Sequence, residues 1–358
     1  MDQEVLSLTK SLVAIPSTAD NNAALKEVLD VALKPLQEFT IEKFSKMDCP
    51  SALIHNQKPG TKHFRVILNA HLDVVPGKKE QYTLQQDGDK LLGRGADDMK
   101  ASAAVLVYLF KEIAAKVSYP LALQLVTDEE VGGFYGARYQ AEEGITTDFY
   151  LTGETTELNI KNEAKGVLWL KATALGKTAH GAYPQNGDNA LWKLKKYLDK
   201  LESAFPVPTE LSWKTTLNLS AVSTTNGAYN KVPDYAEAKL DVRYIPSEAK
   251  TILPKLKSLL TPGVELEVVE ADPFHYTDPN NKDIQALLKI AREFSDGKKS
   301  ELMQGQGASD ARHYSAVGVP AIEFGPIGGG LHSDEEWVSI KGLETYSKIL
   351  KEFLLRAT

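Results

Sequence analysis

Hydrophobic positions near the start of the chain recur first with a helical period and then as short continuous runs. Val5, Leu8 and Leu12 share one helical face, and after a break the segment 23–36 predicts a second helix. The run FRVILNAHLDVV (64–75) is too short and too rich in β-branched residues for a helix, so we expect a buried strand there. The alanine-rich segment 99–116 predicts a long apolar helix.

Two further apolar runs end abruptly in acidic residues. They are YPLALQLVTDEE (119–130) and DFYLTGETTEL (148–158), and both have the pattern of a buried strand. Strands that alternate with helices in this way predict an α/β fold, a three-layer domain with a largely parallel central sheet.

The pattern changes near Gly166, where apolar and polar positions begin to alternate as in strands with one solvated face. From there to about position 271 the order is strand, helix, strand, strand, helix, strand, which is the split β-α-β-β-α-β arrangement of ferredoxin-like α+β domains. The α/β style then resumes. We therefore expect an inserted domain of residues 166–272 within a discontinuous domain of residues 1–165 and 273–358.

Composition and charge narrow the classes of function. The net charge of -7 argues against a nucleic-acid partner, which would require a basic face. Cys49 is the only cysteine, so no disulfide within the chain and no cysteine-based zinc site can form. The start of the chain is acidic and amphipathic, unlike a signal peptide, and no apolar run reaches membrane-spanning length. We expect a soluble cytoplasmic protein with no membrane partner.

Acidic residues and histidines collect at the ends of the predicted strands, or in the loops that follow them. In an open α/β sheet, ligands bind beyond the carboxyl ends of the strands. The candidates are His71 with Asp73, Asp97 with Asp98, Glu129 with Glu130, Glu154, and His332 in a glycine-rich loop after the last strand.

Each cluster also has a simpler interpretation. His71 and Asp73 could form a hydrogen-bonded turn, and an aspartate of GRGADDMK could cap the following helix. The glutamate pair could lie in a solvated loop, Glu154 could be a charge at a helix start, and His332 could be an exposed loop residue. Together these interpretations are weaker, because five such clusters at one sheet edge would repel one another without a cation.

Imidazoles with carboxylates suit zinc, and manganese or cobalt are tolerable substitutes. Two histidines and three carboxylates can bind two ions that share one carboxylate, roughly 3.5–4 Å apart. One spare glutamate would then be left near the metals as a general base.

Seven motifs carry a resemblance to a known family. The motifs are, in order, AHLDVVPG, GRGADDMK, TDEE, TGE, GKTAHGAYPQNGDNA, NKVPD and LHSDEEW. With these motifs the chain resembles the dinuclear zinc amidohydrolases, which include acetylornithine deacetylase, succinyl-diaminopimelate desuccinylase, aminoacylase and glutamate carboxypeptidase. The likeness covers almost the whole chain, and this family also contains a β-α-β-β-α-β insertion.

The resemblance implies a role for each candidate. His71 and Glu154 would bind one metal ion, Glu130 and His332 the other, and Asp98 would bridge both. Asp73 would orient the ring of His71, and Glu129 would be the general base. The family often has a cis peptide bond after the bridging aspartate, here Asp98–Met99.

The resemblance also implies a substrate and a partner subunit. His180 resembles the family histidine that reaches across a dimer to stabilise the oxyanion, so a homodimer through the inserted domain is implied; the residues alone favour a surface histidine in a turn. Arg312 and Arg243 match positions that bind a substrate carboxylate, and Asn230 matches a polar contact from the lid. For Arg243, a salt bridge on an outward strand position is an open alternative.

Two departures from the family pattern stand out. Ala308 replaces a threonine of the desuccinylase motif, and GETT replaces Gly-Glu-Pro around Glu154. A glutamate at this position, rather than an aspartate, favours the deacylases and carboxypeptidases.

We expect a zinc-dependent hydrolase that cleaves the amide bond of an N-acyl amino acid by attack of a metal-bridging hydroxide. The alternative is a carboxypeptidase or dipeptidase that acts on a short peptide with a free carboxylate. A binding protein without activity is disfavoured because every ligand and the base are kept. A phosphate-binding loop is disfavoured because GRGADDMK lacks the Gly-Lys-Ser/Thr ending.

Overall fold

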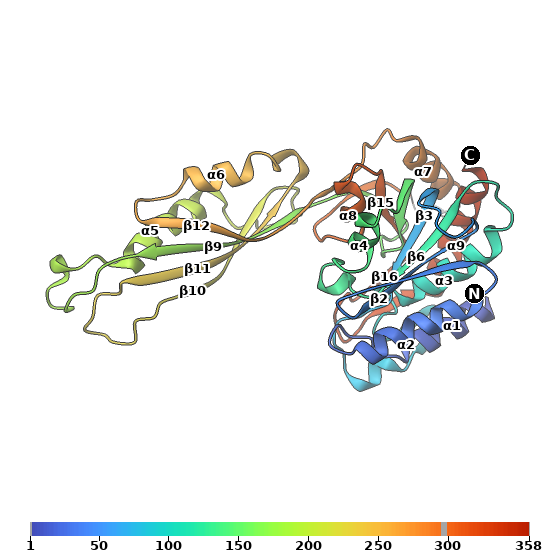
Figure 1. Ribbon diagram of the computed structural model, residues 1–358, viewed down its shortest axis with the longest axis horizontal. Helices are drawn as coiled ribbons and strands as arrows, with labels where there is room; N and C mark the ends of the chain where they lie inside the picture. Colours follow the sequence, from blue (N-terminus) through green and yellow to red (C-terminus); the bar gives the residue numbers. More distant parts are fainter. Residues whose placement is uncertain (1, 295–298, 358) are drawn as a thin grey trace. The chain divides into compact units, whose positions relative to one another are not determined.

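The structure is a computed structural model that describes residues 2–294 and 299–357. It divides into two compact units, each drawn in Figure 1. Unit 1 comprises Met1–Glu163, His275–Gln304 and Ser309–Thr358, and unit 2 comprises Ala164–Phe274 and Gly305–Ala308. Each unit encloses its own cluster of buried apolar side chains.

A mixed sheet forms the centre of unit 1. Its inner strands β6, β3, β7 and β15 are parallel neighbours, whereas β1, β2 and β8 pair antiparallel at the two sides. The largely parallel sheet predicted from the sequence is confirmed. In sheet order the strands are β1 (Thr40–Lys46), β2 (Cys49–His55), β6 (Leu121–Val126), β3 (His63–His71), β7 (Thr146–Thr152), β15 (Ala321–Phe324), β8 (Ile160–Ala164) and β13 (His275–Tyr276), with β14 (Leu302–Gly305) paired to β8.

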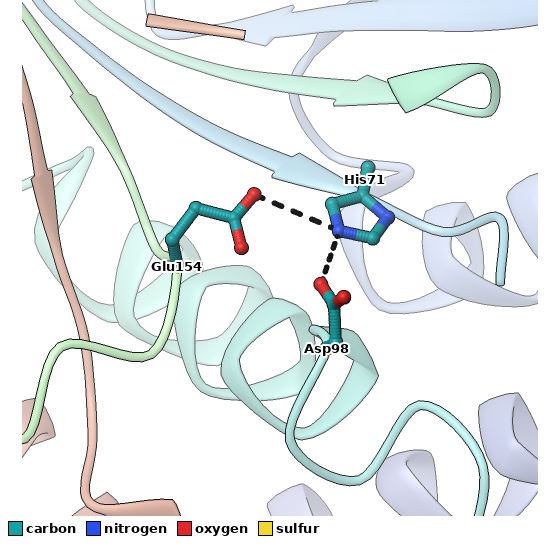
Figure 2. Close-up of side chains that lie close together, drawn as sticks. All are labelled: His71, Asp98 and Glu154. Carbon is teal, nitrogen blue, oxygen red and sulfur yellow. Dashed lines mark hydrogen bonds and ion pairs between the residues drawn. The ribbon is translucent and has the colours of Figure 1, made fainter. Parts of the chain in front are cut away.

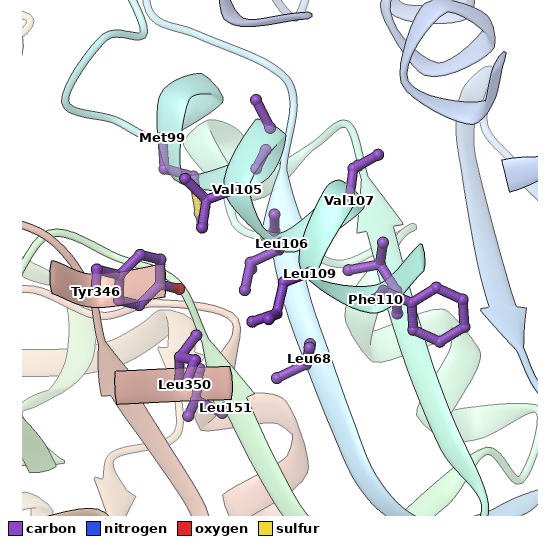
Figure 3. Packing of buried hydrophobic residues seen from close by; sticks show 14 of the residues in the cluster. Leu68, Met99, Val105, Leu106, Val107, Leu109, Phe110, Leu151, Tyr346 and Leu350 are labelled. Carbon is purple, nitrogen blue, oxygen red and sulfur yellow. The ribbon is translucent and has the colours of Figure 1, made fainter. Parts of the chain in front are cut away.

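Helices cover both faces of this sheet, which makes three layers. Alternation along β3 explains why both faces are buried: Val66 and Leu68 enter one apolar core, and Ile67 enters the other. Figure 3 shows part of the larger core, where side chains of α3 and α9 meet Leu68 and Leu151 of the sheet. The larger core contains α1 (Gln3–Val13), α2 (Asn22–Leu33), α3 (Lys100–Ile113), α7 (Lys282–Phe294) and α9 (Ile340–Arg356); the smaller one contains α4 (Ala137–Glu142) and α8 (Ala311–Ala316).

A small antiparallel sheet, which the sequence does not predict, lies in unit 1. Its order is β16 (Gly328–Gly329), β17 (Trp337–Ser339), β5 (Lys90–Leu92) and β4 (Gln85–Asp87). Such short strands leave almost no periodic pattern to detect. The 3₁₀ turns of unit 1 are η1 (Lys34–Leu36), η2 (Lys79–Tyr82) and η3 (Glu129–Val131).

Unit 2 has the predicted order of elements. It consists of β9 (Gly166–Leu175), α5 (Ala190–Ala204), β10 (Thr216–Ser223), β11 (Tyr235–Tyr244), α6 (Ile252–Ser258) and β12 (Val264–Asp272), with 3₁₀ turns η4 (Pro184–Asn186) and η5 (Pro246–Glu248). The four strands form an antiparallel sheet in the order β10-β11-β9-β12, and both helices pack on it through one apolar core.

Helix α6 is short, with seven residues. Pro254 is the third residue of α6, and proline is tolerated only in the first helical turn, where an N–H has no intrahelical partner. Within residues 2–294 and 299–357, none of the helices combines the length and apolar character needed to span a bilayer.

Candidate metal centre

The candidate residues gather where the inner strands of unit 1 end. His71 is the last residue of β3, Glu129 and Glu130 follow β6, and Glu154 follows β7. These three strands are parallel neighbours, so their carboxyl ends meet at one edge of the sheet. The loop before α3 brings Asp98 to the same place, and the Asp98–Met99 peptide bond is cis, as the family resemblance implied.

Asp98 lies between two histidines and directs one carboxylate oxygen to each. Its Oδ1 is 2.8 Å from Nε2 of His71, and its Oδ2 is 3.0 Å from Nε2 of His332. Oε1 of Glu154 is 3.6 Å from the same His71 nitrogen, as Figure 2 shows. On the other side, Oε2 of Glu130 is 3.1 Å from Nε2 of His332. Two groups of ligands therefore share one carboxylate.

The ligand atoms within each group lie within 4.8 Å of one another, close enough to surround one cation. One group is His71, Asp98 and Glu154, and the other is Asp98, Glu130 and His332. His71 is fully buried, whereas the side chain of His332 is 48% exposed. The second group thus opens toward solvent.

The chemistry of the described residues fits divalent cations. Oε1 of Glu154 is buried and, in the described part of the chain, accepts no hydrogen bond. Burial and the negative charge of Asp98 raise the pKa of Glu130 to about 7. Burial raises the pKa of Glu154 as well, and the charge of Asp98 adds to this. Bound cations would remove this penalty by neutralising the carboxylates.

Asp73 contacts the centre in a way that the sequence did not predict in full. Nδ1 of His71 is 3.0 Å from the main-chain oxygen of Asp73 and 3.5 Å from its carboxylate, so the carbonyl is the closer acceptor. A proton on Nδ1 leaves Nε2 free to face Asp98, as a metal ligand requires. The carboxylate of Asp73 accepts the N–H groups of Glu129 (3.2 Å) and Glu130 (2.9 Å).

Glu129 lies beside the two ligand groups and belongs to neither, among the residues that the structure describes. Its side chain is only 12% exposed, and burial raises the pKa of its carboxyl well above the usual value. The nearest guanidinium nitrogen, Nη1 of Arg312, is 4.0 Å away. Because Glu129 is outside both ligand groups, its carboxylate can accept and release a proton without having to dissociate from a metal ion.

The sequence model described as peptidase family M20/M25/M40 matches residues 67–356. The chain belongs to this family. Its activity is that of a metal-dependent amidohydrolase or peptidase acting on small acyl amino acids or peptides. Each of the two ligand groups could hold one of two metal ions.

Individual M20 relatives cover almost the whole chain. The succinyl-diaminopimelate desuccinylase of Sphingopyxis alaskensis is 28% identical over 98% of this chain and 97% of its own length. That of Delftia acidovorans is 29% identical over 98% of this chain and 97% of its own length. Aminopeptidase PepT from Bacillus cereus has a TM-score of 0.80 at 18% identity, with 99% and 98% of the two chains covered. This last likeness shows that the fold is shared.

Arg312 lies beside the candidate metal centre, and its guanidinium group forms hydrogen bonds within the protein. It is buried, and it donates to the main-chain oxygens of Gly132 (2.7 Å) and Ser309 (3.2 Å). These bonds hold the loop that follows Glu129. A role in binding a substrate carboxylate stays a prediction.

The other three predicted site residues lie in unit 2. His180 is exposed and forms an isolated β-bridge with Lys231, and the main-chain oxygen of the exposed Asn230 accepts the N–H of Gly181 at 2.7 Å. His180 and Asn230 are thus on adjoining loops. Arg243 pairs with Asp241 on the same strand at 2.9 Å, which is the salt bridge considered as its alternative. The functional roles of all three stay predictions.

Two residues that contact the candidate metal ligands were not predicted from the sequence. Glu336 and Arg94 are 1% and 3% exposed and form an ion pair with each other. Both lie in motifs, LHSDEEW and GRGADDMK, that drew attention for other residues. In the run of acidic residues that contains Glu336, the sequence does not indicate which side chain is buried. The capping interpretation of Asp97 and Asp98 is wrong, because α3 has Met99 at its N-cap and no side-chain cap.

Proposed function

We propose that this protein hydrolyses the amide bond of an N-acyl amino acid and uses two divalent metal ions, most suitably Zn²⁺. One observation carries the proposal: the carboxylate of Asp98 is shared between two groups that each contain a histidine and a glutamate. Nitrogen and oxygen ligands of this kind suit zinc, and cobalt or manganese are acceptable substitutes. The desuccinylases among the relatives act on an N-acyl amino acid, which supports this substrate class.

His71, Asp98 and Glu154 would hold one ion, and Asp98, Glu130 and His332 the other. When bound, such ions polarise the scissile carbonyl and lower the pKa of bound water toward about 7. The protein residues keep these ligands apart and oriented. Asp73 directs the ring of His71 and holds the main chain of Glu129 and Glu130.

Glu129 is the general base in this proposal. Its carboxylate accepts a proton from the attacking water and returns it to the nitrogen of the leaving amino group as the C–N bond breaks. The products are a carboxylic acid and a free amino acid. Burial raises the pKa of Glu129, which suits a group that must both accept and donate a proton, although bound cations act in the opposite direction.

The remaining predicted residues have supporting roles in the proposal. His180 stabilises the oxyanion across a homodimer formed through unit 2, and Asn230 adds a polar contact to the substrate. Arg312 and Arg243 bind its carboxylate. These assignments, like the cytoplasmic location and the absence of nucleic-acid and membrane partners, are predictions from the sequence.

The carboxypeptidase or dipeptidase alternative uses the same centre on a peptide bond. It is not favoured, because the likeness to desuccinylases covers nearly the full length at 28–29% identity. The solved peptidases share the fold, but their sequence identity to this chain is too low to indicate which substrate it cleaves.

The decisive experiment compares N-acetyl amino acids, N-succinyl amino acids and dipeptides on the same zinc-loaded preparation, with release of free amino groups as the readout. We expect faster turnover of an N-acyl amino acid than of any dipeptide, and loss of activity on chelation that zinc restores. Faster dipeptide cleavage would select the alternative. Undiminished activity in protein shown to be metal-free would end the proposal.

A further inference from the structure

The small sheet of unit 1 places Glu336 close to Asp98, the residue that both ligand groups share. In the β17–β5 pairing Trp337 lies opposite Leu92, so the preceding Glu336 lies opposite the segment just after Leu92. The N–H of Gly93 accordingly donates to the main-chain oxygen of Glu336 at 3.2 Å. The buried side chain of Glu336 then reaches the loop that contains Asp98.

The two carboxylate oxygens of Glu336 have different partners. Oε1 accepts the N–H of Asp97 at 3.0 Å and the N–H of Asp98 at 3.2 Å. Oε2 accepts a hydrogen bond from Nη1 of Arg94. The other terminal nitrogen of Arg94 donates to the main-chain oxygen of His332 at 3.3 Å. A single buried ion pair therefore connects the main chain of Asp98 to that of His332, two ligands 234 positions apart.

The two ligand groups depend on this connection to different degrees. In the first group, His71 ends β3 and Glu154 follows β7, and these paired strands hold both ligands. The N–H of Gly153 also donates to Asn69 at 3.0 Å. In the second group, His332 lies in a loop with a left-handed backbone (φ 58°), and its side chain is half exposed. The loop of His332 connects β16 and β17, which pair over only two residues each, and His332 itself belongs to neither strand. Its position therefore depends also on contacts such as that with Arg94.

We propose that Glu336 and Arg94 are positioning residues that set the spacing between Asp98 and His332, and that binding of the second metal ion depends on them more than binding of the first. The inference rests on the proposed two-metal centre. Partners that orient metal ligands typically contribute 10–100-fold to metal affinity. Here the contribution falls on the Asp98, Glu130 and His332 group, because the ligands that this pair connects are the bridging residue and the loop histidine.

The test measures metal stoichiometry and affinity, by elemental analysis after desalting and by titration against a chelator of known affinity. The variants are Glu336→Ala, which removes both contacts, and Glu336→Gln, which keeps an acceptor for the two N–H groups but presents its NH₂ to Arg94. Glu335→Ala, a change at the exposed neighbour, is the matched control. The wild type and the control should bind two ions.

For Glu336→Ala we expect folded protein that keeps one ion tightly and binds the second about 10–100-fold more weakly, with activity regained at higher metal concentration. Glu336→Gln should lie between this variant and the wild type. Two ions bound with wild-type affinity, or equal weakening of both, would overturn the inference. If Glu336→Ala does not fold, the same measurement on Glu336→Gln decides. A wild type that binds fewer than two ions would refute the two-metal centre itself.

Discussion

The main-chain N–H of Glu130 donates to the carboxylate of Asp73 over 2.9 Å, although 57 positions separate the two residues. The adjacent N–H of Glu129 donates to the same carboxylate. Asp73 therefore connects the end of β3 to the turn that carries the proposed base and a metal ligand. The position of Asp73 therefore bears on both the proposed proton transfer by Glu129 and the proposed metal binding by Glu130.

Replacing Asp73 with Ala should lower both metal affinity and turnover. The turn loses the acceptor of two N–H groups, and the His71 ring loses a nearby carboxylate, so we expect about 10–100-fold weaker metal binding. Metal titration and steady-state kinetics on one preparation measure the two effects. Asp148→Ala, which removes an exposed partner of His63, is the control. Normal metal affinity with impaired turnover would limit the role of Asp73 to Glu129.

Replacing Glu129 with Gln should abolish turnover and leave both metal ions bound. Glutamine keeps the shape of the side chain but cannot accept the proton, and general-base catalysis contributes about 10²–10⁴-fold in rate. Elemental analysis beside kcat separates the two properties. Loss of a metal ion from this variant would instead make Glu129 a ligand.

Replacing His180 with Ala should depress kcat far more than metal content. The residue lies in unit 2, outside both ligand groups, and its proposed role is to stabilise the oxyanion. Loss of one such donor costs about 10²–10³-fold in kcat. His63→Ala, at an exposed histidine of unit 1, should leave kcat unchanged. Wild-type turnover by His180→Ala would refute the role.

The stability of unit 1 should fall as the pH falls below 6.5, in part through His313. Burial, with the neighbouring charge of Arg312, lowers the pKa of His313 to about 3, and its Nε2–H donates to Gly132 at 2.9 Å. The unfolded chain takes up this proton near pH 6.5 and the folded protein does not. Protons therefore favour unfolding between these two values, by about 1.4 kcal/mol per pH unit.

Thermal unfolding of metal-free protein at pH 6.5 and pH 5 checks this prediction. His313→Gln retains a donor for Gly132 but cannot be protonated, so its stability should fall by about 2 kcal/mol less than that of the wild type over this interval. His63→Gln, at an exposed position, should behave as the wild type. Equal losses in all three proteins would show that His313 does not contribute.

Three of the proposed ligands were predictable because each follows a strand whose end the pattern of apolar residues revealed. Parallel strands place their carboxyl ends together, so His71, Glu130 and Glu154 could be expected to converge. The role of Asp73 was only partly predictable, because it involves main-chain N–H groups that no residue type reveals. Arg94 and Glu336 could not be recognised, because their burial depends on a small sheet with strands of two or three residues.

The fold class, the order of elements in unit 2 and the candidate metal-binding residues could be predicted from the sequence alone, because side-chain chemistry and hydrophobic period are local properties. Which oxygen of Asp98 faces which histidine, and which charged groups are buried, became known only from the three-dimensional arrangement. Those depend on strand register and loop packing between segments more than 200 positions apart, where distance and exclusion of water set the interaction.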